Sequence, residues 1–177
     1  MMKLKRGFLL VSDFILCWDF LTSLFVASIL YYLLPSTISN AFSRDVYGIG
    51  ISVLSIVFSV YFAALAIIIS SSDDDFVDFL EEQGSYTGII STFRSSLFIL
   101  FIALLFSLFI YALTSAWIAS GVNPGQTGFQ SKKYFVAFVF LFFYGLFCAL
   151  NATLDSIKYA LSRARYLKIK RYNNRIK

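Results

Sequence analysis

The stretch VYGIGISVLSIVFSVYFAALAIII, Val46 to Ile69, decides the fold of this chain. It contains twenty-four residues with no charge and no proline. About 20 consecutive apolar residues are enough for an α-helix to cross the hydrocarbon core of a bilayer. The sequence therefore predicts a membrane-spanning helix over residues 46–69.

Three further apolar runs of similar length lie on either side of this stretch. One precedes it, at residues 8–34, and ends at Pro35. Two follow it, at residues 97–120 and 134–154, and the turn sequence Gly-Val-Asn-Pro-Gly at 121–125 separates them. We expect an all-α domain of four membrane-spanning helices over residues 1–154, followed by a cytoplasmic tail over 155–177.

The composition of the whole chain agrees with this class. Of the 177 residues, 59% are apolar and 14% are charged, against about 45–50% and about 25% in soluble domains. The chain has no His, and its two cysteines, Cys17 and Cys148, both lie in apolar runs. Nucleotide-binding loops and serine-nucleophile motifs are also missing. We expect neither an enzyme nor a metal or cofactor site.

The basic residues predict which way the chain crosses the membrane. If the N-terminus is cytoplasmic, the cytoplasmic segments hold 12 of the 15 Lys and Arg residues and the outer loops hold three, namely Arg44, Lys132 and Lys133. Lys and Arg accumulate on the cytoplasmic side of membrane proteins. Both termini are therefore expected in the cytoplasm.

An acidic segment at residues 70–84 joins the second and third spans. Phe76, Phe79 and Leu80 share one face, and Gly84 ends the pattern. This spacing predicts a short amphipathic helix. It fits a solvated linker or a contact surface for the basic tail, whereas the spacing of an EF-hand calcium loop is missing. We assign gating to four of its acids on the hypothesis of an ionic clamp with the tail: Asp73, Asp74, Asp75 and Asp78.

The tail at residues 155–177 is basic and has no Gly or Pro separating it from the fourth span. One continuous helix from about 134 to about 172 is therefore expected. Such a tail can contact anionic lipid, and its interleaved tyrosines also suit a polyanion such as an oligonucleotide, or a cytosolic partner protein. The candidate contact residues are Lys158, Arg163, Arg165, Lys168, Lys170 and Arg171.

Polar residues inside the apolar runs are the candidates for an ion path. Asp19 lies deep in the first run, where a carboxylate usually faces a bundle interior or a water path; hydrogen-bonded packing is the alternative. Asn151 is the corresponding polar residue of the fourth run. In the second run Ser52, Ser55 and Ser59 fall on one stripe of small residues, which fits either close helix packing or a pore wall.

Three classes of function remain open. An oligomeric channel predicts ion flux and toxicity. A sensor or scaffold predicts only the capture of a cytosolic partner by the tail. A small proton-coupled exporter predicts substrate resistance that depends on Asp19. Because four helices cannot enclose a wide path alone, a channel requires a symmetric homo-oligomer.

The order of these parts resembles the small four-span membrane proteins of bacterial antiphage defence operons. The parts are the second span ending in IIISSSDDDFVDFL at 67–80, then GSY at 84–86, then Phe93-Arg94 before the third span, and the basic tail. Membrane components of the Hailong and Kiwa systems are examples. The resemblance implies a homotetramer in the bacterial inner membrane. A Hailong-like protein would be a channel that depolarises the cell, and a Kiwa-like protein would be a sensor that acts with a cytosolic DNA-binding partner.

Overall fold

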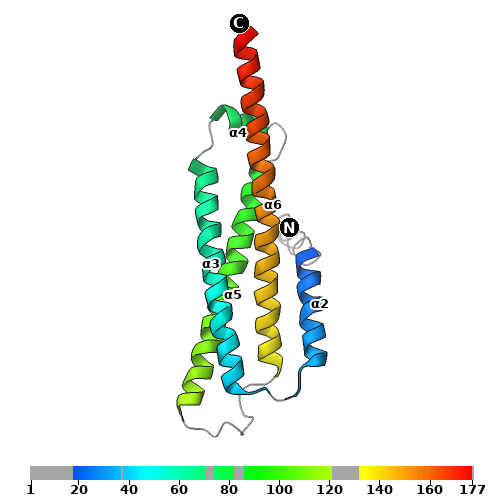
Figure 1. The fold of residues 1–177 in the computed structure, drawn as a ribbon, viewed down its shortest axis with the longest axis vertical. Helices are drawn as coiled ribbons and strands as arrows, with labels where there is room; N and C mark the ends of the chain where they lie inside the picture. Colours follow the sequence, from blue (N-terminus) through cyan, green and yellow to red (C-terminus); the bar gives the residue numbers. More distant parts are fainter. Residues whose placement is uncertain (1–17, 37, 71–73, 82–85, 121–131, 177) are drawn as a thin grey trace, which may run out of the picture.

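The computed structural model describes residues 18–36, 38–70, 74–81, 86–120 and 132–176. These residues form helices and their short flanks, and no strand occurs among them. Figure 1 shows how the helices are arranged. In chain order they are α2 (Trp18–Leu33), α3 (Asn40–Ser70), α4 (Asp74–Glu81), α5 (Tyr86–Ala119) and α6 (Lys132–Ile176).

Three of these helices, α3, α5 and α6, are long and apolar enough to cross a membrane. The fourth apolar helix, α2, has 16 residues, or about 24 Å at 1.5 Å per residue, which is less than the roughly 30 Å of a hydrocarbon core. Residues 8–17 of the predicted first span lie outside the described part of the chain. The chain is thus all-helical, with three helices that could span a membrane.

The helices extend beyond the apolar runs from which they were predicted. Helix α3 begins at Asn40 rather than at residue 46, and α5 begins at Tyr86 rather than at residue 97. The additional turns contain polar residues such as Arg44 and Arg94. Hydropathy marks only the part of a helix that suits hydrocarbon, whereas the backbone hydrogen bonds continue into the polar flank. Helix α6 is continuous over 45 residues, so the tail continues the last long apolar helix directly.

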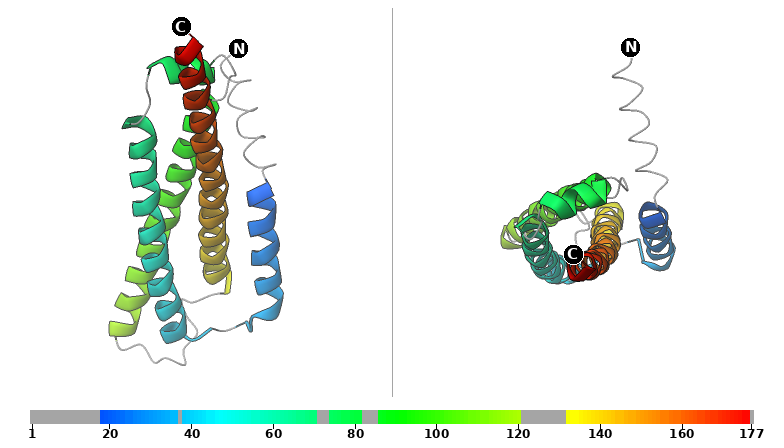
Figure 2. Two further views of the ribbon diagram at one scale, coloured as in Figure 1. Left: turned by 45° about the horizontal axis from the view of Figure 1, so that its top comes forward. Right: turned by 90° about the horizontal axis from the view of Figure 1, so that it is seen from above.

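Helices α3, α5 and α6 pack against one another as a three-helix bundle, and α2 packs on α6. Viewed along the bundle, α6 lies between α2 and the other two long helices (Figure 2). The short helix α4 crosses the end of the bundle at which α3 ends and α5 begins. Near the C-terminus, α6 extends past all the other helices (Figure 1).

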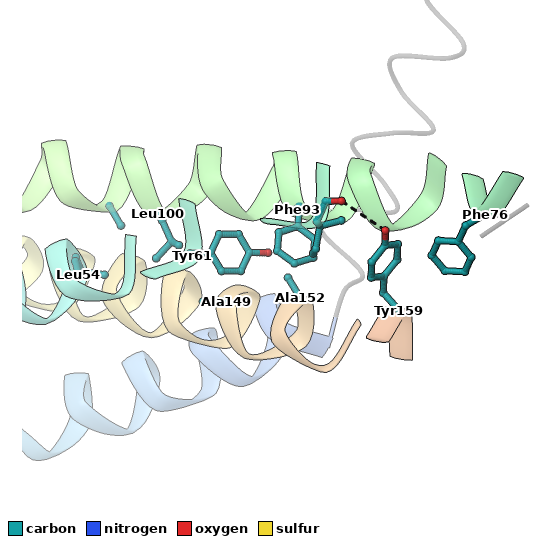
Figure 3. Packing of buried hydrophobic residues seen from close by; sticks show 10 residues of the cluster. Leu54, Tyr61, Phe76, Phe93, Leu100, Ala149, Ala152 and Tyr159 are labelled. Atoms are coloured by element: carbon teal, nitrogen blue, oxygen red, sulfur yellow. Dashed lines mark hydrogen bonds between the residues drawn. The ribbon is translucent and has the colours of Figure 1, made fainter. Parts of the chain in front are cut away.

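Small and aromatic residues fill the interior of this bundle. Ala149 and Ala152 of α6 are buried, and they let α5 approach closely. Tyr61 of α3 stacks on Phe93 of α5 with ring centroids 4.8 Å apart (Figure 3). Leu54 is fully buried in the same cluster. The interior of a single chain is therefore packed with side chains.

Gly50 provides a test of this packing. A Cβ atom added at Gly50 would clash with the ring of Phe138, which is 3% exposed and held against Tyr47 with ring centroids 4.8 Å apart. We expect Gly50→Ala to lower the free energy of unfolding by about 1 to 2 kcal/mol, because the ring has no room to move. Thermal unfolding in detergent measures this.

Gly88 is the matched control, since an added Cβ there meets no atom within 4 Å. Gly88→Ala should leave the melting temperature unchanged or raise it slightly. Equal melting temperatures for Gly50→Ala and Gly88→Ala would show that the ring of Phe138 can move away from α3, and would contradict tight packing between α3 and α6.

Candidate functional site

A polar pair joins α2 to α6 inside the apolar part of the chain. Asp19 is 6% exposed, and its carboxylate accepts a hydrogen bond of 2.5 Å from the Nδ2 atom of Asn151. One turn along α2, the hydroxyl of Ser23 donates to the Asp19 carbonyl oxygen at 2.6 Å. Ionisable groups at membrane depth are costly unless they are paired. The pair therefore fixes where α2 sits on α6.

Aromatic side chains also join α2 to α6. Phe20 contacts Phe140 and Tyr144 of α6, edge to face, with ring centroids 5.3 Å and 5.8 Å apart. On the α5 side of α6, the hydroxyl of Ser96 donates to the carbonyl oxygen of Cys148 at 3.2 Å. A hydrogen bond in such a low-dielectric setting is stronger than one in water, and a partner left unpaired is more costly.

The structure separates the residues that the sequence suggested for an ion path. Asp19 faces α6 within one chain and is not on an open face. Ser52 and Ser59 lie on the exposed side of α3, and Ser55 is half-buried. The Ser52 hydroxyl donates to the Gly48 carbonyl at 3.0 Å, and that of Ser59 donates to the Ser55 carbonyl at 2.8 Å. Since α2 packs on α6, one chain does not bring Asp19 and these serines together.

Helix α4 is docked on α6 through one phenylalanine. Phe76 is 1% exposed, and its ring lies 5.4 Å from those of both Tyr159 and Tyr166. Figure 3 shows Phe76 beside Tyr159, whose hydroxyl donates to the Ile68 carbonyl oxygen at 3.5 Å. The contact therefore links α4, the last turn of α3 and the C-terminal half of α6.

The other end of α4 is tied to α5. The Glu81 carboxylate accepts hydrogen bonds from the Thr87 backbone N–H at 3.2 Å and from the Thr87 hydroxyl at 2.7 Å. A carboxylate at the first turn satisfies an amide that has no partner within the helix, and it suits the positive end of the helix dipole. Any displacement of α4 would therefore break these hydrogen bonds or move the first turn of α5.

The predicted gating acids make no ion pair with the tail in the part of the chain that is described. Asp78 is exposed. Asp74 and Asp75 begin α4, but their side chains, like the whole of Asp73, lie outside the described residues. The ion pairs among the described residues join Arg44 to Asp45 and Lys158 to Asp155. Here the observed contact between α4 and the tail is aromatic, and the ionic clamp stays a prediction.

The tail presents its cations on two different faces of α6. Lys158, Arg165 and Lys168 are exposed, and their spacing places them on one outward face. Arg163 and Lys170 are half-buried. The Nζ atom of Lys170 lies 5.7 Å from the centre of the Tyr166 ring. The side chain of Arg171 lies outside the described residues. Among the described cations of the tail, Lys158, Arg165 and Lys168 are the exposed ones, so they form an open face for a large anion.

The described residues contain no group of three or more His, Cys, Asp or Glu side chains placed to hold a metal ion. Three features remain as the candidate site: the Asp19–Asn151 pair, the docked α4 helix and the outward basic face of α6. Comparisons with protein-family models, with curated proteins and with solved structures give no match to this chain.

Proposed function

We propose that this chain is the subunit of a homo-oligomeric ion channel of the bacterial inner membrane, opened from the cytoplasm. Its four spans are α2 with the residues before it, α3, α5 and α6, and both termini are cytoplasmic. The resemblance to antiphage defence proteins supports a role as an effector that depolarises an infected cell, as a tetramer. Membrane lipid and other copies of the chain are its permanent partners.

The hydroxyl face of α3 is the observation that carries this proposal. Ser52 and Ser59 are exposed in a single chain, near the middle of an apolar stretch of twenty-four residues. Their hydrogens are used on the helix's own carbonyl groups, which leaves oxygen lone pairs to replace water around a permeating ion. A helix that only anchored the protein in lipid would gain nothing from this face.

Closed packing inside one chain supports assembly from several copies. Leu54 and Leu100 are fully buried in the bundle, so they close the space between the described helices α3, α5 and α6 of one chain. Cyclic symmetry would place the α3 faces of neighbouring copies around one axis. In this arrangement the Asp19–Asn151 pair holds α2 in place at the cytoplasmic half of the channel wall.

Gating in this proposal depends on α4. A polyanion bound to Lys158, Arg165 and Lys168 would change the position of the C-terminal part of α6. The contact of Phe76 with Tyr159 would transmit that change to α4. Because α4 is tied to Ile68 of α3 through Tyr159 and to the start of α5 through Glu81, its release can move two spans at once.

Membrane potential during induced expression in bacteria tests the proposal. The intact chain, or a deletion after Leu161 that removes a restraint, should depolarise the cells. The double variant Ser52→Leu/Ser59→Leu should abolish this effect, because it replaces the polar face with hydrocarbon. Ser28→Leu is the matched control, since Ser28 is an exposed serine on α2 with the same kind of backbone bond, 2.8 Å to Leu24. Equal depolarisation by all variants would exclude α3 as the pore wall.

A membrane sensor that recruits a cytosolic nucleic-acid-binding partner is the second candidate. The observation that favours it is the outward basic face, on a helix that extends past all the others (Figure 1). This function predicts no depolarisation by any variant, with or without phage challenge. It also predicts that deletion after Leu161 abolishes the capture of a cytosolic protein.

A further inference from the structure

Two adjoining cavities form a groove between α3 and α6. The first has a volume of about 470 Å³ and is lined by apolar residues such as Ile56, Val60 and Ile157. The second has a volume of about 390 Å³, lies nearer the C-terminus, and is lined by Ile68, Arg163 and others. Ser156 and Ala160 line both cavities, so the two form one continuous groove.

The groove crosses the level at which the apolar part of α3 ends. Ile68 is one of the last apolar residues of α3, and the Tyr159 hydroxyl that donates to its carbonyl places Tyr159 at the same depth. Arg163 follows one helical turn later, or about 6 Å along α6. Lipid head groups occupy the layer of roughly 5 to 8 Å just outside the hydrocarbon core. The guanidinium therefore lies at head-group level, above an apolar channel.

Arg163 differs from the other cations of the tail. Its side chain is half-buried in the groove, and within the described ranges it makes no ion pair. Arg165, Lys168 and Lys158 lie on the outward face instead. A guanidinium is well suited to a phosphate because it can donate two parallel hydrogen bonds.

We propose that this groove binds one anionic phospholipid, with an acyl chain along Val60, Ala64 and Ile157 and its phosphate on Arg163. Charge complementarity selects the lipid, since none of the described residues that line the cavity next to Arg163 is acidic. With the topology proposed above, this end faces the cytoplasmic leaflet, which is rich in anionic lipid. The site is separate from the outward basic face and does not depend on ion conduction.

Native mass spectrometry of the full chain, titrated with phosphatidylglycerol or phosphatidylcholine, tests the site. We expect a preference for phosphatidylglycerol and a loss of about fivefold in its affinity for Arg163→Gln, the effect of one basic residue near a charged surface. Arg94→Gln, at an exposed arginine of α5 that does not line the groove, is the matched control and should bind as the unmodified chain does. Equal losses for the two variants would overturn the proposal, because the chain would then attract lipid only through its net charge.

The shape of the groove gives a second, independent test. Ala160→Trp fills the groove and should release bound phosphatidylglycerol, whereas Ala112→Trp, at an exposed position of α5, should not. If a second copy covers the groove instead, Ala160→Cys will form disulfide-linked dimers in native membranes when Cys17 and Cys148 are replaced by Ala. Such dimers would overturn the lipid site. If Ala160→Trp does not fold, Arg163→Gln still decides the proposal.

Discussion

Asn151→Leu is expected to lower the free energy of unfolding by about 3 kcal/mol, because it leaves the Asp19 carboxylate buried and without the amide that it contacts at 2.5 Å. The variant should also loosen α2 on α6, since this pair is a buried polar contact between them. Thermal unfolding in detergent measures the first effect. Disulfide trapping between cysteines introduced on α2 and α6 measures the second.

Substituting the other partner of the pair should lower the free energy of unfolding by less. Asp19→Leu leaves the neutral amide of Asn151 without this hydrogen bond, which should lower the free energy of unfolding by about 1 to 2 kcal/mol. In the double variant Asp19→Leu/Asn151→Leu neither polar group remains, and two leucines can pack between helices that are already apolar. The double variant should therefore be more stable than Asn151→Leu alone and close in stability to the unmodified chain.

The four proteins form a double-mutant cycle, in which a shared hydrogen bond gives strongly non-additive effects. Thr153→Leu is the matched control on α6. Its hydroxyl donates to the carbonyl of Ala149, at 2.7 Å, within α6 itself. Additive effects of Asp19→Leu and Asn151→Leu would contradict the pair and return Asp19 to the set of residues available to line a pore.

The sequence alone predicts the helical class and the three helices that are long and apolar enough to span a membrane, for a simple physical reason. An apolar run such as 46–69 is not stable when exposed to water. In lipid, a single segment can satisfy the hydrogen bonds of its own backbone only as a helix. The ends of the helices are less predictable. The polar turns at Asn40 and Tyr86 carry no hydropathy signal, and their helical state follows from continuity with the apolar part.

The contacts of the candidate site could not be predicted in the same way. Asp19 and Asn151 each stand out as polar residues in apolar runs, but they are 132 residues apart. Only the packing of α2 on α6 brings them together. For Phe76, periodicity predicts an apolar face on α4 and does not identify what that face contacts. The ring of Phe76 packs against Tyr159 and Tyr166, which are two helical turns apart on α6. From the sequence alone, either tyrosine could equally have been an anchor at the membrane interface.

Phe76→Ala is expected to undock α4 and, in the channel proposed above, to open it without a ligand. Truncating a fully buried phenylalanine costs about 3 kcal/mol or more, and every 1.4 kcal/mol changes an equilibrium tenfold. The ratio of docked to undocked α4 should therefore fall roughly a hundredfold. With only 8 residues, α4 is too short to be a stable helix on its own, so losing this one contact also weakens the helix.

Two measurements separate docking from gating. Cleavage by a Glu-specific protease at the exposed Glu81 should accelerate in Phe76→Ala, because the bond becomes accessible only when α4 unfolds or leaves the bundle. Membrane potential should collapse in the same cells without phage challenge. Val77→Ala, at the neighbouring half-buried position, is the matched control and should change neither measurement, while Phe76→Leu should restore part of the docking.

The combination of outcomes identifies what α4 does. Faster cleavage together with depolarisation supports α4 as the element that holds the channel closed, since the same contact then controls both. Faster cleavage with a normal membrane potential would contradict gating through α4 and would leave Phe76 a structural link between α3, α4 and α6. Unchanged cleavage would contradict the docking itself. In that case the ionic clamp of Asp73, Asp74, Asp75 and Asp78 with the tail would be the remaining way to hold this segment in place, and high salt should then release it.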